Sequence, residues 1–448
     1  MTSPPLQRLC KRFAPLFQHF ADAGYDLYLV GGSVRDALLG GRADHDLDFA
    51  TNARPDDIIA LLQSKGWRPI TLGARFGTIG AHVHGDIIEI TTYRAVERYD
   101  AMSRKPEVVF GNTIAEDLGR RDLSINAMAA DAEGRVIDPY KGEEALHQGL
   151  LEVPGGGYEN TVSILSEDPL RLLRIARFYA RLGFVPTADT TRAASDTHER
   201  LRAISHERWK MELDKLLVAP HVPEALGWLA DSGGLCVVFP WMEQVLRLGA
   251  LARLQEHLRL ASPDVAIRWA VLGAHLASAV LTGAPLAPDH GPDPQRAADL
   301  ALEIAQRLRL SAREAKSLRR LCALPLRRSS LAALGTRPAL RRLYRSLQED
   351  TPHAFALLDS LLLMEGDEEP ARRQLADAWE AFREASAQDQ LTPDLPKGLG
   401  IAIQEAFGLA AGPKVGAMLR RVDEATLEGM LPLRPSVDEA LGWLREHP

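Results

Sequence analysis

The chain has 448 residues, enough for roughly two to four folding units with buried cores. Its composition, 46% hydrophobic and 25% charged, is that of an ordinary soluble protein. Aromatic residues make up only 6%, which disfavours a protein that binds by stacking many bases on aromatic side chains. The net charge of −7 argues weakly against nucleic-acid binding, although screening makes the local distribution of charge matter more than its sum.

The cysteines and the apolar stretches indicate a soluble, cytoplasmic protein. Cys10, Cys236 and Cys322 are far apart and form neither a zinc pattern nor a disulfide framework, which suits a reducing compartment. Residues Met1–Phe17 lack the features of a signal peptide. The longest uncharged stretch, Trp269–Pro288, is interrupted by small and polar residues and by proline. We therefore expect it to be a buried helix running into a loop, and not a membrane span.

The first 150 residues contain both strand and helix patterns. The segment Pro55–Lys65 has helical spacing. Short apolar runs with β-branched residues are separated by glycine-bearing turns, and they predict four strands: Leu27–Val30, Ile79–Val83, Ile87–Thr92 and Val108–Phe110. From about Ser163 onward the pattern is helical, interrupted at Pro220–Pro223, Thr282–Pro294 and Gln388–Gly398. The predicted fold class is α+β, with a mixed head followed by small helical units.

The strongest local signal begins where the first predicted strand ends, at Gly31 and Gly32. A helix is expected to start near Ser33. The glycine pair allows backbone N–H groups to approach a phosphate closely, and the helix N-terminus adds partial positive charge. Arg35 could donate two hydrogen bonds to triphosphate oxygens. Gly31, Gly32 and Arg35 are therefore candidate nucleotide-binding residues.

A pair of aspartates follows ten residues later. Asp46 and Asp48 flank one residue of a predicted strand, so both carboxylates should point to the same face of the sheet. Two such neighbours repel unless a cation joins them, and carboxylates are the ligands of hard divalent ions. We predict that Asp46 and Asp48 are catalytic residues that bind Mg²⁺. Two ions about 4 Å apart would activate a 3′-hydroxyl and stabilise a leaving pyrophosphate.

These elements resemble the motifs of the class II tRNA nucleotidyltransferase and bacterial poly(A) polymerase family, over about Asp26–Leu217. Arg120–Ala127 is similar to the second motif, and the resemblance implies that Arg121, Asp122 and Asn126 lie at the ribose and phosphates. Asp138–Gly142 resembles the third, with a lysine at 141 where glycine is more usual. The resemblance implies a nucleotidyltransferase head (1–150), a helical neck (151–220), a body (221–330) and a tRNA-binding tail (331–448).

The fourth motif lies in Glu167–Phe178. Asp168 could accept a hydrogen bond from the exocyclic amine of cytosine or adenine, and Arg171 could donate to the neighbouring ring nitrogen. Guanine and uracil present the opposite polarity, so this pair would select CTP and ATP without a template. The family also assigns Arg174 and Arg177 to the nucleotide. A fifth stretch, Glu207–Leu217, resembles the helix that closes the neck, and we interpret it as structural.

The resemblance implies addition of C and A to the 3′ end of tRNA from CTP and ATP, with pyrophosphate release. Leu72–Ile79 is closer to the Gly-Thr strand of the tRNA enzymes than to that of poly(A) polymerases. A retained loop at Arg94–Pro106 favours an enzyme that can add the terminal A. An A-adding specialist and a poly(A) polymerase remain alternatives. The helix around Ala270–Leu276 has no His-Asp pair, so no phosphohydrolase activity is predicted.

Two further classes share parts of this pattern. A non-catalytic RNA-binding relative would lack Asp46 or Asp48, and both are present. A small-molecule nucleotidyltransferase would need neither the Asp168 and Arg171 pair nor an arginine-rich tail. No membrane and no obligate protein partner is indicated.

An arginine-rich stretch, Arg307–Arg345, contains a single acid, Glu314. It could bind the phosphate backbone of tRNA, and the candidate RNA-binding residues are Arg319, Arg320, Arg327 and Arg328. The alternatives are a solvated helical face, or ion pairs with the acidic stretch Glu365–Glu369.

Overall fold

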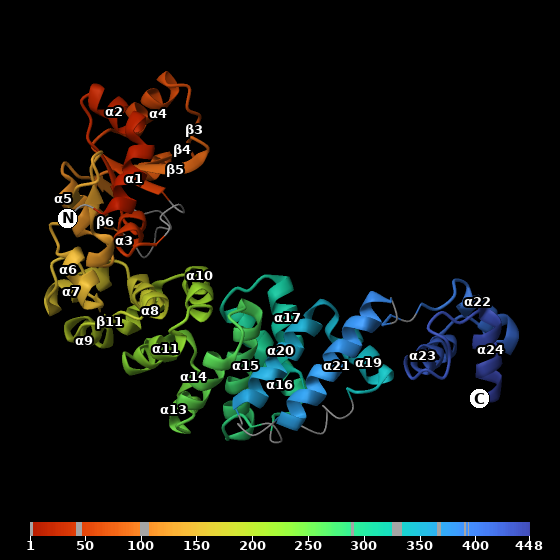
Figure 1. Ribbon diagram of the computed structural model, residues 1–448. Helices are drawn as coiled ribbons and strands as arrows, with labels where there is room; N and C mark the ends of the chain where they lie inside the picture. Colours follow the sequence, from red (N-terminus) through yellow and green to blue (C-terminus); the bar gives the residue numbers. More distant parts are fainter. Residues whose placement is uncertain are drawn as a thin grey trace. The chain divides into compact units, whose positions relative to one another are not determined.

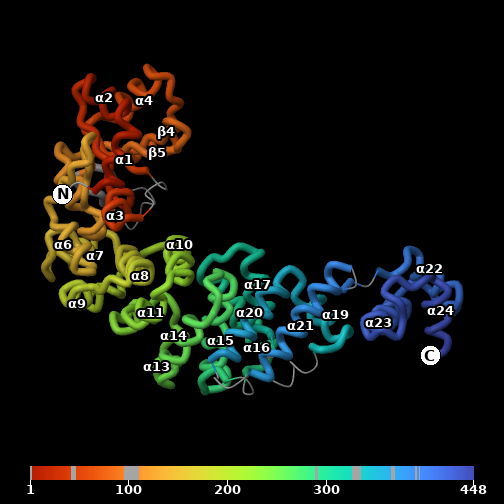
Figure 2. The backbone as a smooth tube through the Cα atoms, in the orientation of Figure 1, coloured from red at the N-terminus to blue at the C-terminus, as the bar shows by residue number. Residues whose placement is uncertain are grey.

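The computed structural model describes residues 3–41, 47–98, 107–287, 291–324, 334–364, 369–388, 391–392 and 394–448. The chain forms two compact units, Met1–Pro240 and Trp241–Pro448. Figure 1 and Figure 2 trace them from red at the N-terminus to blue at the C-terminus. The first unit contains the sheet and the helices that follow it, and the second is helical.

A mixed seven-stranded sheet organises the first unit, with strand order β3-β4-β5-β2-β1-β8-β9. Strands β2 and β5 run parallel, and the other neighbours are antiparallel. The strands are β1 Leu27–Val30, β2 Leu47–Thr51, β3 Pro69–Ile70, β4 Thr78–Val83, β5 Asp86–Thr92, β8 Ala129–Ala130 and β9 Val136–Ile137. Strands β6 (Arg94–Arg98) and β7 (Glu107–Phe110) form a separate hairpin, and β10 (Leu150–Leu151) pairs with β11 (Val185–Pro186).

Strand β2 packs its Phe49 side chain against aromatic rings of the N-terminal segment. Phe49 is buried, whereas its neighbour Asp48 is only partly buried. The rings of Phe13 and Phe17 meet the Phe49 ring edge-on, with centroids 5.5 and 5.7 Å away. Phe13 joins α1 (Pro4–Arg12) to α2 (Ala14–Asp22), so this helix pair covers the Phe49 face. Because successive side chains alternate, Asp48 points to the opposite face.

Helices complete the first unit. Those of the head are α3 Gly32–Leu38, α4 Pro55–Ser64, α5 Ile114–Gly119 and α6 Gly142–Gln148, with short 3₁₀ turns η1 Ala74–Phe76 and η2 Ser124–Asn126. The following helices are α7 Tyr158–Glu167, α8 Leu170–Leu182, α9 Ala188–Thr197, η3 His198–Ala203, α10 His206–Leu217, α11 Val222–Asp231 and α12 Gly234–Val238. Helix α8 packs against both α10 and α11, and it ends at Gly183, whose φ of 72° is left-handed.

Apolar side chains of the second unit pack into separate clusters within the described ranges. Phe355, Trp379 and Phe382 lie in one of them, and Ile403, Val422 and Leu444 lie in another. The helices are α13 Met242–Arg247, α14 Leu251–Leu260, α15 Val265–Thr282, α16 Pro294–Arg307, α17 Ala312–Cys322, α19 Arg337–Leu347, η4 Gln348–Asp350, α20 Thr351–Met364, α21 Glu369–Ala387, α22 Leu399–Phe407, α23 Pro413–Leu427 and α24 Val437–Glu446.

The predicted fold class, α+β with a mixed head and a helical remainder, is confirmed. The four predicted strands correspond to β1, β4, β5 and β7, and the three predicted interruptions fall between helices. Helix α15 confirms the predicted buried helix. By length and composition it could cross a membrane, but 72% of its 18-residue window is buried inside the protein, as in a core helix. The four-part division of the chain stays a prediction.

A buried polar chain crosses three helices of the second unit. Nδ1 of His257 (α14) lies 3.1 Å from Nε2 of His275 (α15), and Nε2 of His257 lies 2.9 Å from Oγ of Ser360 (α20). All three side chains are buried. Burial lowers the pKa of His257 to about 4 and lowers the pKa of His275 well below its usual value, and the nearby Arg253 charge adds to both effects. Both histidines are therefore neutral at pH 7.

The buried contacts of His257, His275 and Ser360 predict that the second unit is sensitive to acid. Unfolded histidines bind protons near pH 6.5, whereas His257 resists protonation until about pH 4, so the unfolded state binds more protons in that window. The free energy of unfolding should therefore fall as the pH drops from 7 towards 4. Thermal denaturation at stepped pH measures this. His275→Phe should flatten the pH dependence, whereas His82→Gln, at an exposed histidine, should not. Equal slopes in all three proteins would contradict the prediction.

Candidate functional site

The glycine turn after β1 brings the first two motifs together. Gly31 has a φ of 74°, which is left-handed, and a Cβ added there would lie 2.8 Å from Nη1 of Arg121. Nη2 of Arg121 donates to Asp117 at 3.1 Å. Among the residues that the structure describes, Nε of Arg121 and Oγ of Ser124 are buried without a hydrogen-bond partner. Such atoms are suited to a bound ligand.

Arg35 lies inside this site and is 2% exposed. Its Nη1 donates to Oδ1 of Asn126 at 2.5 Å, its Nε donates to Asp36 at 2.8 Å, and its guanidinium lies 5.1 Å from the centre of the Phe178 ring. Burial lowers its pKa, an effect that Asp36 opposes. Arg35 thus connects α3 to the second motif and to α8. Its contact with a triphosphate stays a prediction.

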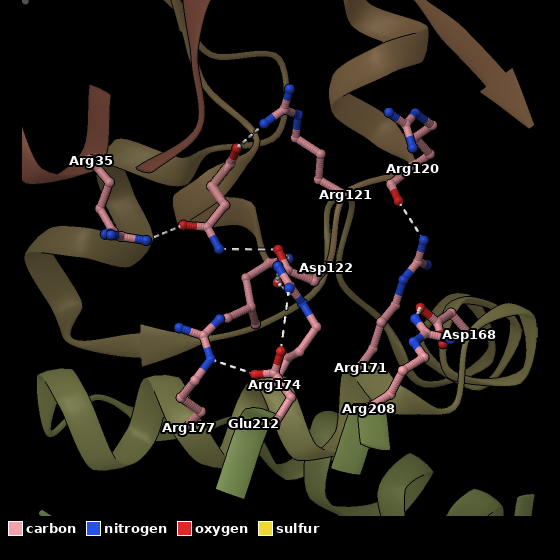
Figure 3. Close-up of polar contacts among 12 residues, drawn as sticks. Arg35, Arg120, Arg121, Asp122, Asp168, Arg171, Arg174, Arg177, Arg208 and Glu212 are labelled. Atoms are coloured by element: carbon pink, nitrogen blue, oxygen red, sulfur yellow. Dashed lines mark hydrogen bonds and ion pairs between the residues drawn. The ribbon is translucent and has the colours of Figure 1, made fainter. Parts of the chain in front are cut away.

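Asp122 is the buried centre of the site (Figure 3). Its Oδ1 accepts from Nδ2 of Asn126 at 3.0 Å and from the backbone N–H of Leu123 at 2.9 Å. Its Oδ2 accepts from Nε of Arg174 at 2.8 Å. Burial alone would raise the Asp122 pKa, but Arg174 and Asn126 outweigh it and hold that pKa well below its usual range. Asp122 is therefore an ionised anchor and not a proton donor.

The third motif packs against the second. The Asp138 carboxylate accepts from the backbone N–H groups of Gly142 and Glu143 at 2.7 and 2.9 Å, which caps α6. Helix α6 packs against η2, which carries Asn126. A Cβ added to Gly142 would lie 2.4 Å from the Ser124 carbonyl oxygen. Lys141 has a φ of 58°, in the left-handed region where glycine is favoured, which accounts for the usual glycine there.

Substitutions at Lys141 and Gly142 should change the free energy of unfolding in opposite directions. Lys141→Gly should raise the free energy of unfolding by about 1 kcal/mol, because it relieves a left-handed non-glycine residue. Gly142→Ala should lower it by about 2 kcal/mol, because the new methyl group meets backbone of η2. Chemical denaturation of both variants measures the difference. A stabilising Gly142→Ala would show that α6 can move away from η2.

The fourth motif spans the junction between α7 and α8. Asp168 follows α7 and precedes α8; its Oδ1 accepts from the backbone N–H of Leu170 at 3.2 Å and its Oδ2 from Nη2 of Arg208 at 2.9 Å. Arg171 donates to the carbonyl oxygens of Ile164 and Arg120, at 3.1 and 2.7 Å. Both side chains are buried. Each therefore has intramolecular partners of its own (Figure 3), and their contact with a base stays a prediction.

Helix α10 contributes two residues that the sequence analysis did not assign to the site. Arg208 contacts Asp168, and Oε2 of Glu212 accepts from Nε of Arg177 at 2.6 Å. Oε1 of Glu212 lies 3.8 Å from Nη1 of Arg174. Charged and apolar positions alternate at helical spacing in Glu207–Leu217, a pattern that favours a structural helix and does not reveal these contacts. The spacing of Arg208 and Glu212, one helical turn apart, places both on one face of a helix and is the sequence signal that could have indicated their shared role.

Of the two proposed metal ligands, Asp48 lies among the described residues. Asp48 lies on β2 in register with Glu89 of the parallel strand β5, whereas Asp46 lies outside the described residues. Two neighbouring carboxylates are hard oxygen donors, which fit a divalent cation such as Mg²⁺. Within the described ranges, groups of three or more His, Cys, Asp or Glu side chains that could hold a metal ion do not occur. The assignment of Asp46 and Asp48 to a metal stays a prediction.

The proposed RNA-binding arginines also differ from one another. Arg319 on α17 is exposed. Arg320 donates to Asp350 at 3.1 Å, to Gln348 at 2.7 Å and to the carbonyl oxygen of Leu347 at 3.1 Å, which ties α17 to η4. Arg327 and Arg328 lie outside the described residues, as does most of the acidic stretch 365–369. Glu369 itself contacts Arg373.

Two family models match the chain, almost entirely within the first unit. Residues 27–152 match the poly A polymerase head domain, and residues 183–246 match the probable RNA- and SrmB-binding site of polymerase A. The first match contains β1, β2, η2 and the third motif, and the second contains α10.

Curated relatives and solved structures extend this similarity. The chain is 37% identical over 271 residues to a CCA-adding enzyme of Geobacillus thermodenitrificans and 38% identical over 230 residues to one of Geobacillus kaustophilus. These matches cover 60% and 51% of this chain, and the chain spans only 61% and 54% of those relatives. The fold is similar to that of the Bacillus stearothermophilus CCA-adding enzyme in complex with CTP, with a TM-score of 0.70, 26% identity, and coverage of 99% of this chain and 98% of that one.

Proposed function

The chain belongs to the class II tRNA nucleotidyltransferase and poly(A) polymerase family, and from this premise we propose that it adds C and A to the 3′ end of tRNA. The substrates would be CTP, ATP and a tRNA that lacks part or all of its CCA terminus, and pyrophosphate would leave. One observation carries the proposal. Arginines from three separate motifs, the buried Arg35 and the partly buried Arg121 and Arg174, converge on Asp122 and Asn126 beside the Gly31 turn.

This arrangement suits a nucleoside triphosphate. Arg121 approaches the turn between β1 and α3 closely, and its buried Nε is available to a phosphate or ribose oxygen. The start of α3 supplies backbone N–H groups at the same turn. Asp122 and Asn126 fix the positions of Arg174 and Arg35, so the guanidinium groups are oriented before the nucleotide binds. Arg177 is fixed in the same way by Glu212.

We assign Mg²⁺ to Asp46 and Asp48 as part of this proposal. When bound, the metal would polarise the phosphoryl group and stabilise the leaving pyrophosphate. Asp48 suits this role because β2 turns it away from the Phe49 core and places Glu89 beside it. The protein itself would orient the triphosphate and exclude competing bases.

Base choice and RNA binding complete the proposal. Asp168 and Arg171 would read the edge shared by cytosine and adenine. We propose a division into head (1–150), neck (151–220), body (221–330) and tail (331–448). The head and neck would carry out the chemistry, and the tail would bind tRNA. We place the protein in the cytoplasm, where its tRNA substrate and reduced thiols are found.

An incorporation assay tests the function. Purified protein is given labelled CTP or ATP with tRNA that lacks CCA, tRNA that ends in C, tRNA that ends in CC, and an unrelated oligonucleotide. We expect C on the first two substrates, A only after CC, and nothing on the oligonucleotide. Addition of A alone would identify an A-adding specialist, and long A tails on the oligonucleotide would identify a poly(A) polymerase.

The metal assignment predicts a separation of chemistry from RNA binding. Asp48→Asn should lower incorporation by more than about a hundredfold, since even residues that only orient metal ligands are worth ten- to a hundredfold. The dissociation constant for tRNA should stay within about twofold, because the carboxylate serves the reaction and not the RNA. Asp56→Asn, at an exposed acid on α4, is the control. Full turnover by Asp48→Asn would remove this residue from the metal site.

Two adjacent arginines of α17 should respond differently to substitution. Arg319→Gln should weaken tRNA binding and reduce the slope of log affinity against log salt by about 1, because an exposed phosphate contact is lost. Arg320→Gln should instead lower the free energy of unfolding by about 3 kcal/mol, because the buried Asp350 carboxylate loses its guanidinium partner and keeps the weaker hydrogen bond from the Ser317 hydroxyl. Salt-dependent filter binding and thermal denaturation separate the two. A reduced salt slope for Arg320→Gln with unchanged stability would reverse the assignment.

A further inference from the structure

Helix α10 presents two opposite charges to the helix that is proposed to select the nucleotide. Arg208 and Glu212 lie one turn apart on α10 and so project on one side, towards α8. Figure 3 shows Arg208 beside Asp168 and Glu212 beside Arg174 and Arg177. The Arg208 side chain is 34% exposed and that of Asp168 is 12% exposed, so the carboxylate of this ion pair is largely shielded from water and the guanidinium is partly so.

The Asp168 carboxylate is held at both of its oxygens. Oδ1 accepts from the Leu170 backbone N–H at 3.2 Å, in the first turn of α8, and Oδ2 accepts from Arg208 at 2.9 Å. Because both oxygens are held, rotation of the carboxylate about its Cβ–Cγ bond is restricted. Each oxygen still has a lone pair for another donor, because an ionised carboxylate offers about four acceptor sites. Asp168 can therefore keep both partners and accept a further hydrogen bond.

From this geometry we propose that Arg208 is a specificity-determining residue, which positions Asp168 as a fixed acceptor for the exocyclic amine of cytosine and adenine. The inference rests on the proposed function, and it names the group on which base choice depends. Arg208 acts through Asp168 and does not itself need to touch the nucleotide.

A fixed acceptor discriminates better than a mobile one. Uracil and guanine present a carbonyl oxygen where cytosine and adenine present an amine, so a carboxylate held in place would repel them. Without Arg208 the carboxylate is held at Oδ1 alone and can rotate Oδ2 away from that carbonyl. Removal of Arg208 should therefore weaken binding of the correct base and also relieve the repulsion of the wrong one. Both effects lower selectivity.

The test compares nucleotides within each variant. Using tRNA that lacks CCA, kcat/KM is measured for CTP and UTP, and using tRNA that ends in CC, for ATP and GTP. Arg208→Gln should reduce each preference by about tenfold, the value of one charge-assisted hydrogen bond. Arg208→Lys should restore part of the preference because it keeps a cationic donor. Lys210→Gln is the matched control, since Lys210 lies on the same helix and pairs with Asp214 at 2.6 Å.

A double variant shows whether Arg208 acts through Asp168. In an Asp168→Ala background, Arg208→Gln should cause no further change in either preference, because the positioned group is already gone. A merely structural role would lower kcat/KM for all four nucleotides alike and add to the effect of Asp168→Ala. Either of those results would overturn the inference. Wild-type protein that adds neither C nor A would refute the proposed function instead, and that measurement comes first.

Discussion

The ion pair between Asp122 and Arg174 joins the head of the first unit to α8, and the geometry of the site depends on it. The Asp122 side chain is 6% exposed and that of Arg174 is 36% exposed. A carboxylate buried to this degree is costly unless it is paired and its remaining lone pairs accept hydrogen bonds. Arg174, Asn126 and the Leu123 N–H satisfy that requirement together. Asn126 in turn holds Arg35, so one buried charge orders residues from three motifs.

This dependence explains why motifs so far apart in the sequence occur together. The Gly31 turn has room for Arg121 only because it lacks a side chain, and η2 keeps its place only because Gly142 lets α6 approach. Arg120 is connected to the fourth motif through its carbonyl oxygen, which accepts from Arg171. A change in one motif would therefore move side chains of another.

Much of the head could be predicted from local patterns. The β-branched runs at β1 and β5 and the helical spacing of α4 come from side chains that favour those backbones wherever they occur, so their limits were accurate. Arg35, Asn126, Asp122 and Arg174 are connected by hydrogen bonds, whereas the role of the motif residues at a nucleotide stays a prediction. Lys141 was marked as unusual by sequence, and its left-handed φ gives the physical reason.

The contacts of long charged side chains could not be predicted in this way. Arg319 and Arg320 are adjacent residues with the same side chain. Arg319 is exposed, whereas Arg320 connects α17 to η4. Which of them contacts a partner depends on the packing of Asp350 and Gln348, which are distant in the sequence. The same holds for Arg208 and Glu212, whose partners on α8 and before it become visible only when the helices are packed.

The balance of charge within the site has a consequence for ligand binding. Among the ion pairs around the site, Arg120 and Arg121 share Asp117, and Arg35 and Arg181 share Asp36, so the arginines outnumber the carboxylates that pair with them. An excess of charge of one sign weakens the free protein, and a triphosphate of opposite sign would relieve it. A bound nucleotide would thus stabilise the contacts that hold the head against α8 and α10 as well as being held by them. Binding and ordering of the site would then be two results of the same electrostatic interaction.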